Sequence, residues 1–212
     1  MAPGPSLSLS PDLPLDLPTL DPQVWDTDHP SVAKHHPPVY IILKDPSTII
    51  TQQQYCLIPE AHKGLKPIID HLLQASILIP THLPHNTPIL AVKTGPNSWR
   101  LVQDLRKINE AIMPTFPVVH NPYTLLSTIP PTVTHFTVLD LKDAFFTIPL
   151  HPLSQSLFIF TWQDPMTHMS QQLTWTVLPQ GFRDSPHFFW TGFTKGPTDT
   201  RPSPESSPPI CR

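Results

Sequence analysis

The chain has 212 residues, 31 prolines and a formal net charge of −3. This length suits one domain with tails, and the near balance of charge excludes a protein that binds nucleic acid through an overall positive field. The two cysteines, Cys56 and Cys211, lie far apart in the sequence, which excludes a disulfide framework and fits a reduced intracellular setting. None of the twelve histidines has ligand spacing with cysteines or carboxylates, so no zinc site is expected.

The two ends of the chain differ in composition from the middle. Residues 1–23 are rich in proline, and residues 191–212 are rich in proline and serine. Proline removes a backbone donor and opposes helix and central strand, so we expect a disordered N-terminal segment and an unrelated C-terminal tail. The first twenty residues have no basic region and no continuous apolar run, which excludes a signal peptide and a membrane span. We therefore expect an intracellular, cytoplasmic protein without membrane contacts.

The first predicted elements are a strand and a helix. A run of β-prone residues predicts a strand at 39–43, and apolar residues at three- and four-residue steps predict a helix at 60–78. The regular part of this helix is expected to begin near Lys66, because Pro67 is tolerated only in a first turn.

From residue 89 onward, short strands alternate with helical turns. Strands are predicted at 89–92, 99–102, 136–140, 157–162 and 173–178, the first two of them joined as a hairpin by a Gly-Pro-Asn turn. Short helical turns are predicted at 105–111 and 123–127, and a helix at 180–190 that bends or restarts near Pro186. Mixed short strands and helices without regular alternation indicate the α+β class.

The most informative segment is Thr137–Phe146, in which the predicted strand ends on Asp140 and a second carboxylate, Asp143, follows. A carboxylate at the end of a buried strand is costly unless it is paired. Mg²⁺ is a natural partner, since it is held by one or two carboxylates and substrate phosphates, and this indicates phosphoryl or nucleotidyl transfer. An isolated Asp-x-x-Asp is, however, more often a strand followed by a capping aspartate.

Two further motifs lie on either side of this segment: Trp99–Arg106, which contains Arg100, and Leu178–Phe182, which contains Gln180. In this order and spacing, the three motifs resemble the fingers and palm of a retroviral reverse transcriptase of the gammaretrovirus-like class, which includes many endogenous retroviruses. The resemblance covers about residues 24–190. It implies a right-hand polymerase fold with fingers at about 24–125 and a partial palm at about 126–190. It also implies template-primer RNA or DNA and deoxynucleoside triphosphates as partners, and Mg²⁺ as cofactor.

The resemblance implies roles for five residues of the central segment. Asp140 would hold metal through its carboxylate, and Leu141 through its backbone carbonyl. Main-chain N–H groups of Asp143 and Ala144 would meet triphosphate oxygens. Phe145 would act as a steric gate that excludes a 2′-hydroxyl. From the residues alone, the alternative for Asp143 is a cap for the turn after the strand, and the alternative for Phe145 is ordinary core packing. The next residue, Phe146, is assigned to the core.

The flanking motifs would contact the incoming nucleotide. The guanidinium of Arg100 suits a triphosphate, although a surface salt bridge with Asp104 is the alternative. Lys93 would meet the γ-phosphate, but its turn is about one residue shorter than is usual in the family. Gln180 would contact the sugar. Three further basic residues are candidates for contacts with nucleic-acid phosphates: Arg106, Lys107 and Arg183.

The family's Tyr-x-Asp-Asp motif is absent, because the sequence contains no Asp-Asp pair, and the resemblance ends after Trp190. We therefore expect a truncated reverse transcriptase fragment, arising by frameshift or alternative exon, with one of three metal-binding carboxylates and no catalytic activity. Two alternatives stay open. One is a non-catalytic nucleic-acid-binding fragment that uses the basic residues around Trp99, and the other is an unstructured product without a selected role.

Overall fold

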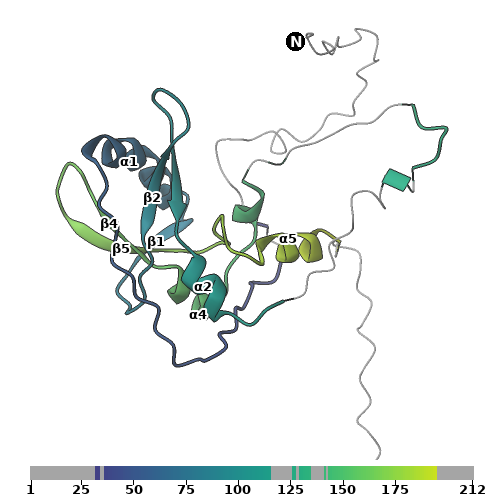
Figure 1. Ribbon diagram of the computed structural model, residues 1–212, viewed down its shortest axis with the longest axis horizontal. Helices are drawn as coiled ribbons and strands as arrows, with labels where there is room; N and C mark the ends of the chain where they lie inside the picture. The colour runs from purple at the N-terminus through teal and green to yellow at the C-terminus, as the bar shows by residue number, and fades with distance from the viewer. Residues whose placement is uncertain are drawn as a thin grey trace, which may run out of the picture.

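The computed structural model describes residues 32–33, 36–115, 126–127, 129–134, 141 and 143–194. Its helices are α1 (Pro59–Gln74), α2 (Arg106–Ala111), α4 (Pro152–Gln155) and α5 (Ser185–Thr194), with 3₁₀-helices η2 (Ala144–Thr147) and η3 (Ser156–Phe158). Its strands are β1 (Leu78–Thr81), β2 (Ile89–Lys93), β3 (Trp99–Gln103), β4 (Phe160–Gln163) and β5 (Ser170–Trp175). This mixture confirms the α+β class (Figure 1). The expected strand at 136–140, most of the expected helical turn at 123–127 and the two ends of the chain lie outside the described residues.

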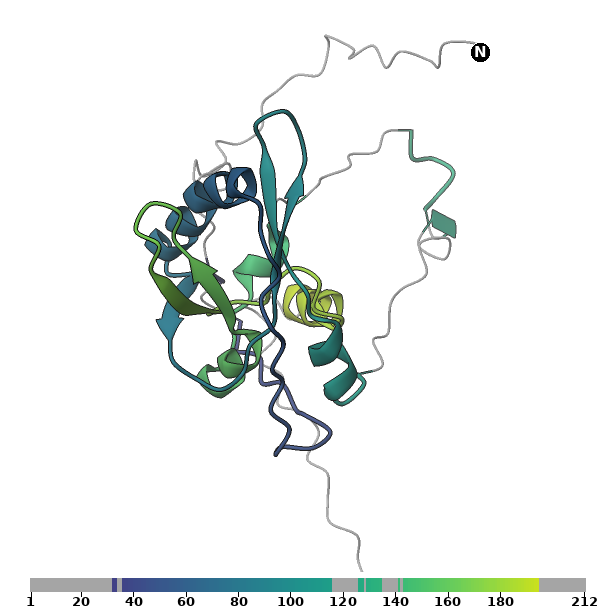
Figure 2. The same ribbon diagram turned by 60° about the vertical axis from the view of Figure 1, so that its left-hand side comes forward.

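Two antiparallel sheets form the frame of the fold. β5 is the central strand of a three-stranded sheet with the order β1-β5-β4, and β2 and β3 form a separate hairpin, as the sequence predicted. In the larger sheet Leu173 lies opposite both Pro80 of β1 and Phe160 of β4. In the hairpin Lys93 lies opposite Trp99. The hairpin stands beside α1, and its turn extends past the helix at the top of both views (Figures 1 and 2).

α1 begins earlier than the sequence predicted. It starts at Pro59, a position where proline is favourable, and it continues through Pro67, so the expected start near Lys66 is wrong. Its buried side chains recur at three- and four-residue steps and pack in the core: Ala61, Leu65, Ile69 and Leu72. Burial of this face outweighs the one backbone hydrogen bond that Pro67 removes. Within the described part of the chain, neither α1 nor any other helix is long and apolar enough to cross a membrane.

Gly64 lets the hairpin lie directly on α1. A Cβ placed on Gly64 would overlap the indole ring of Trp99, which fills the space that a side chain would occupy. Trp99 is half-buried and packs against the hydrophobic core. The close approach of the hairpin to α1 therefore depends on the absence of a side chain at Gly64.

The segment at 39–43 is extended but does not form the predicted strand. Its two ends bridge to two different neighbours, Leu150 and Ile112, and no ladder forms along it. Between the bridges, the N–H of Ile41 donates to the hydroxyl of Ser154 at 2.9 Å. Buried and exposed side chains nevertheless alternate along the segment, as they do in a strand. A side chain has taken the place of a partner strand here.

The strands of the larger sheet differ from their predicted bounds. The strand expected at 157–162 begins as η3 and becomes β4 only at Phe160, and the strand expected at 173–178 is β5, which both starts and ends earlier. β1, which contains Pro80, was not predicted: the helix predicted at 60–78 reaches its first residue, Leu78, whereas α1 ends at Gln74. β1 is an edge strand in the order β1-β5-β4, and edge strands tolerate proline.

The last helix also starts later than expected. The predicted helix at 180–190 is α5, which is preceded by a turn that contains Gln180 and Gly181. Gly181 has a φ of 90°, a conformation that residues with a Cβ rarely adopt. Gln180 therefore lies in a turn, and the expectation that it opens the helix is wrong.

A buried polar network joins the hairpin to the larger sheet. The Nε2 of Gln103 on β3 donates to the hydroxyl of Thr87 at 2.7 Å and to the carbonyl of Phe158 at 3.2 Å. Its Oε1 accepts from the indole N–H of Trp175 on β5 at 2.8 Å. Gln103 is 5% exposed and Trp175 is 4% exposed, so these groups satisfy one another without water.

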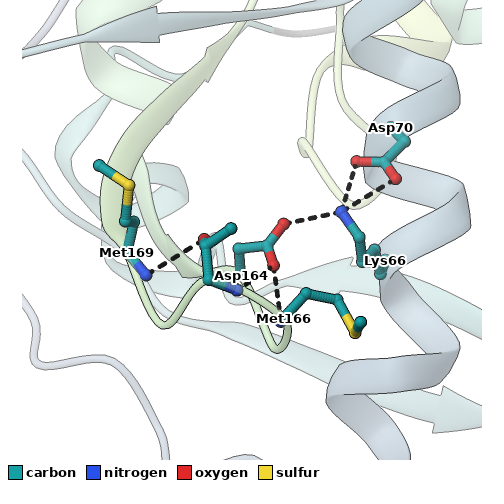
Figure 3. A network of polar contacts seen from close by, with 6 residues as sticks. Lys66, Asp70, Asp164, Met166 and Met169 are labelled. Carbon is teal, nitrogen blue, oxygen red and sulfur yellow. Dashed lines mark hydrogen bonds and ion pairs between the residues drawn. The ribbon is translucent and has the colours of Figure 1, made fainter.

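An ion-pair network ties the connection between β4 and β5 to α1 (Figure 3). The Nζ of Lys66 lies 2.7 Å from Asp164 and 3.1 Å from Asp70. Asp164 also accepts the backbone N–H groups of Met166 at 2.7 Å and Thr167 at 3.0 Å. The ammonium of Lys66 and these N–H groups lower the pKa of Asp164 to about 2. One carboxylate therefore holds the turn and anchors it to the helix.

Candidate functional site

One cavity lies between α1, the hairpin and the second half of the chain. Its volume is about 380 Å³, and three of the predicted site residues line it: Arg100, Asp143 and Gln180. Its wall also includes Ile68, His71, Leu72, Thr94, Trp99, Leu101, Phe146 and Trp175. The fold thus brings together residues from all three sequence motifs.

Arg100 brings a guanidinium to the wall of this cavity. It is exposed on β3, and among the described residues it takes part in no hydrogen bond or ion pair. The alternative salt bridge with Asp104 does not form, because the two oxygens of Asp104 accept from Nε and Nη2 of Arg106 at 2.9 and 2.7 Å. Arg100 can therefore meet an anionic ligand without losing a partner among the described residues.

Asp143 and Gln180 both line the cavity and contact each other. The Nε2 of Gln180 donates to Oδ1 of Asp143 at 3.4 Å. Asp143 has a φ of 53°, in the left-handed region that aspartate tolerates better than most residues. Its side chain makes no capping hydrogen bond to η2, so the capping interpretation is not supported. The left-handed residue directs the chain from the cavity into η2.

Lys93 lies beside the cavity and not in its wall. Its Nζ is 2.9 Å from Oε1 of Glu60 on α1 and 5.5 Å from the ring centroid of Trp99. The next residue, Thr94, lines the cavity instead. The shorter turn noted in the sequence therefore coincides with a lysine that is held against the helix.

The two phenylalanines of the central segment have different surroundings. Phe146 is 9% exposed, stacks on Trp175 with ring centroids 5.3 Å apart and lines the cavity, so its assignment to the core is confirmed. Phe145 is half-buried, and its ring meets Phe189 of α5 edge-on at 6.2 Å. Ala144, between Asp143 and Phe145, begins η2.

Two of the three basic residues proposed for nucleic-acid contacts are engaged within the fold. Arg106 holds the carboxylate of Asp104 from two nitrogens, and these hydrogen bonds keep the pKa of Asp104 far below its usual range. Arg183 donates to the carbonyl of Asn109 at 2.9 Å and so ties the turn before α5 to α2. Lys107 is exposed on α2, away from the cavity residues. Arg106 and Arg183 are therefore held by contacts within the fold, whereas Arg100 and Lys107 keep exposed charge.

The described residues do not form a complete divalent-metal site. Asp140 lies outside them, and Leu141 is described and 55% exposed. Among the described residues, no group of three or more histidine, cysteine, aspartate or glutamate side chains is placed to hold a metal ion. Asp143 is the one described carboxylate in the cavity wall.

Sequence reasoning did not single out Gln103, Trp175 or His71, which support or line the cavity. His71 could have been found, because it falls on the same face of α1 as Ile68. Gln103 and Trp175 carry no such signal. A buried glutamine is recognised only when its partners, distant in sequence, are known.

A family model for reverse transcriptase (RNA-dependent DNA polymerase) matches residues 91–202 of the chain. The chain is 47% identical over 172 residues to the Gag-Pol polyprotein of koala retrovirus, covering 80% of this chain and 10% of that protein. It is also 47% identical over 182 residues to the Pol polyprotein of feline endogenous virus ECE1, covering 85% and 17%. The chain therefore spans less than a fifth of the length of these relatives.

A solved structure adds the fold to this evidence. The crystal structure of the prototype foamy virus protease-reverse transcriptase matches with a TM-score of 0.59 and 31% sequence identity, over 73% of this chain and 20% of that one. The fold and the relatives agree with the resemblance found in the sequence motifs. The chain belongs to the reverse transcriptase family and is related to the gammaretroviral Pol polyproteins.

Proposed function

We propose that the cavity between α1, the hairpin and η2 is the triphosphate-binding pocket of a reverse transcriptase. In this proposal the 212-residue chain alone binds a deoxynucleoside triphosphate but does not polymerise it. The observation that carries the proposal is that Arg100, Asp143 and Gln180, from three separate motifs, line one cavity of about 380 Å³. The family implies a template-primer as the further partner.

Arg100 supplies the principal attraction for the triphosphate. Its guanidinium is exposed to the cavity and has no ionic partner among the described residues, and its planar donors suit phosphate oxygens. The backbone N–H groups of Asp143 and Ala144 supply further donors at the start of η2. The carboxylate of Asp143 would repel phosphate. The amide of Gln180 donates a hydrogen bond to this carboxylate at 3.4 Å. Gln180 retains its second amide hydrogen for the sugar.

Selection of the sugar is assigned to the ring of Phe145. The support is its place directly before Phe146, which lines the cavity, and its packing against Phe189, which limits the movement of the ring. A 2′-hydroxyl next to a fixed apolar ring would lose its water without gaining a hydrogen bond.

The lack of polymerisation follows from the carboxylates. The family's two-metal chemistry aligns a primer hydroxyl with the triphosphate. In this proposal Asp140 and Leu141 are the residues of this chain that would contact Mg²⁺. The sequence has no Asp-Asp pair to complete the site, so another segment or chain would have to supply it. Binding of the nucleotide and its incorporation are therefore expected to be separable.

Equilibrium binding of dTTP to the purified chain tests the proposal. Arg100→Ala should weaken binding about 10- to 100-fold, the loss expected when charge-assisted hydrogen bonds are removed. Lys107→Ala is the matched control, since it removes an exposed cation that lies outside the cavity. Equal weakening by both variants, or no binding of dTTP by the unmodified chain, would refute the assignment of the pocket.

A further inference from the structure

One face of α1 lines part of the cavity and also contacts Lys93, which lies beside the cavity. Glu60, Gly64, Ile68 and His71 follow one another at helical steps along α1. Ile68 and His71 line the cavity, and Gly64 carries the indole of Trp99. Glu60, at the start of the same face, holds Nζ of Lys93 at 2.9 Å. α1 therefore positions both the hairpin, whose residues form part of the cavity wall, and Lys93 at the end of β2.

Trp99 links the lysine to the cavity. One side of its indole rests on Gly64, and Nζ of Lys93 lies 5.5 Å from the ring centroid, within the range of a cation–π contact. Trp99 and Thr94 both line the cavity, whereas Lys93 does not. The ammonium group thus sits at the edge of the pocket, on the same ring that forms part of its wall.

We propose that Glu60 is a positioning residue that holds Lys93 away from the cavity, so that a bound triphosphate must take the lysine from this glutamate. This inference rests on the proposed function of the pocket. The pair is well exposed, with side chains 48% and 63% accessible, and exposed ion pairs contribute little stability. The flexible stem of a lysine lets its ammonium change partner without movement of the backbone. The glutamate therefore tunes the affinity of the pocket without closing it.

The affinity for dTTP tests this competition. Glu60→Gln should tighten binding about two- to five-fold, which corresponds to release of one exposed ion pair. Glu110→Gln is the matched control, because it removes the same charge from an exposed helical position on α2. In a Lys93→Ala background, Glu60→Gln should have no effect on affinity, which gives a double-mutant cycle for the pair. Thermal melts of every variant show whether loss of an acidic residue from the first turn of α1 has altered the fold.

Acetylation of lysines, measured by mass spectrometry, provides a direct readout of Lys93. The inference predicts that dTTP protects Lys93 from acetylation while Lys107 stays equally reactive, and that Glu60→Gln makes Lys93 more reactive without nucleotide. If Arg100→Ala weakens binding but Glu60→Gln matches Glu110→Gln and Lys93 is not protected, the inference is overturned and the proposed pocket stands. If dTTP neither binds nor protects Lys93, both are overturned.

Discussion

The buried side chain of Gln103 offers a sharp test of how the hairpin is joined to the sheet. Gln103→Leu keeps a side chain of similar volume, so it opens no large cavity, but it removes the acceptor for Trp175 and the donors to Thr87 and Phe158. The hydroxyl of Thr87 keeps a contact with the carbonyl of Ile159 at 3.4 Å. The indole N–H of Trp175 is left buried without an acceptor. One such donor costs about 1–3 kcal/mol, and with the other lost bonds we expect destabilisation of about 2–4 kcal/mol.

Urea unfolding followed by far-ultraviolet circular dichroism measures this change. Gln171→Leu on β5 is the control, because Gln171 is half-exposed and makes no side-chain hydrogen bond within the described residues. Adding Trp175→Phe to Gln103→Leu should recover part of the loss, since the unsatisfied donor is then absent. A free energy of unfolding for Gln103→Leu within about 0.5 kcal/mol of the unmodified chain would refute the network as a stabilising link.

Three further outcomes are expected. Gly64→Ala should destabilise the fold by about 1–3 kcal/mol in the same urea assay, although alanine favours helix, because its methyl group meets Trp99; a stabilised variant would contradict the packing. The depressed pKa of Asp164 means that its ion pair with Lys66 contributes fully above about pH 4 to 5 and is lost as the pH falls toward 2. Asp164→Asn should therefore flatten the acid limb of a plot of urea midpoint against pH, and an unchanged limb would argue against the pair. Primer extension with Mg²⁺ or Mn²⁺ should show no incorporation by this chain, and incorporation that Asp140→Ala abolishes would disprove its inactivity.

Local patterns predicted the parts of the fold in which neighbouring residues set the structure. The turn between residues 94 and 98 specifies the hairpin, and the apolar spacing from Leu65 to Leu72 specifies a helix. The start of the regular part of α1 was misplaced because Pro67 opposes helix locally. The hairpin residue that lies on Gly64 comes much later in the sequence, so no local pattern could reveal it.

The site was predicted through its motifs and only partly through its geometry. Arg100 and Gln180 were named from the sequence, and both line the cavity. Lys93 was named as well, but its position depends on Glu60, a partner on another element. Arg106 was named too, but it pairs with Asp104 in the turn just before α2, which leaves Arg100 without a partner among the described residues. The partner of Lys93 is set by the tertiary fold, which a motif does not contain.

Amide chemical-shift mapping with dTTP tests the central claim most directly, because it locates the bound nucleotide on the folded chain. The account predicts shifts at Thr94, Arg100, Asp143 and Gln180, which line the cavity, and their loss in Arg100→Ala. Shifts concentrated instead in the open groove between residues 48–51 and α2, or no shifts at saturating dTTP, would contradict it.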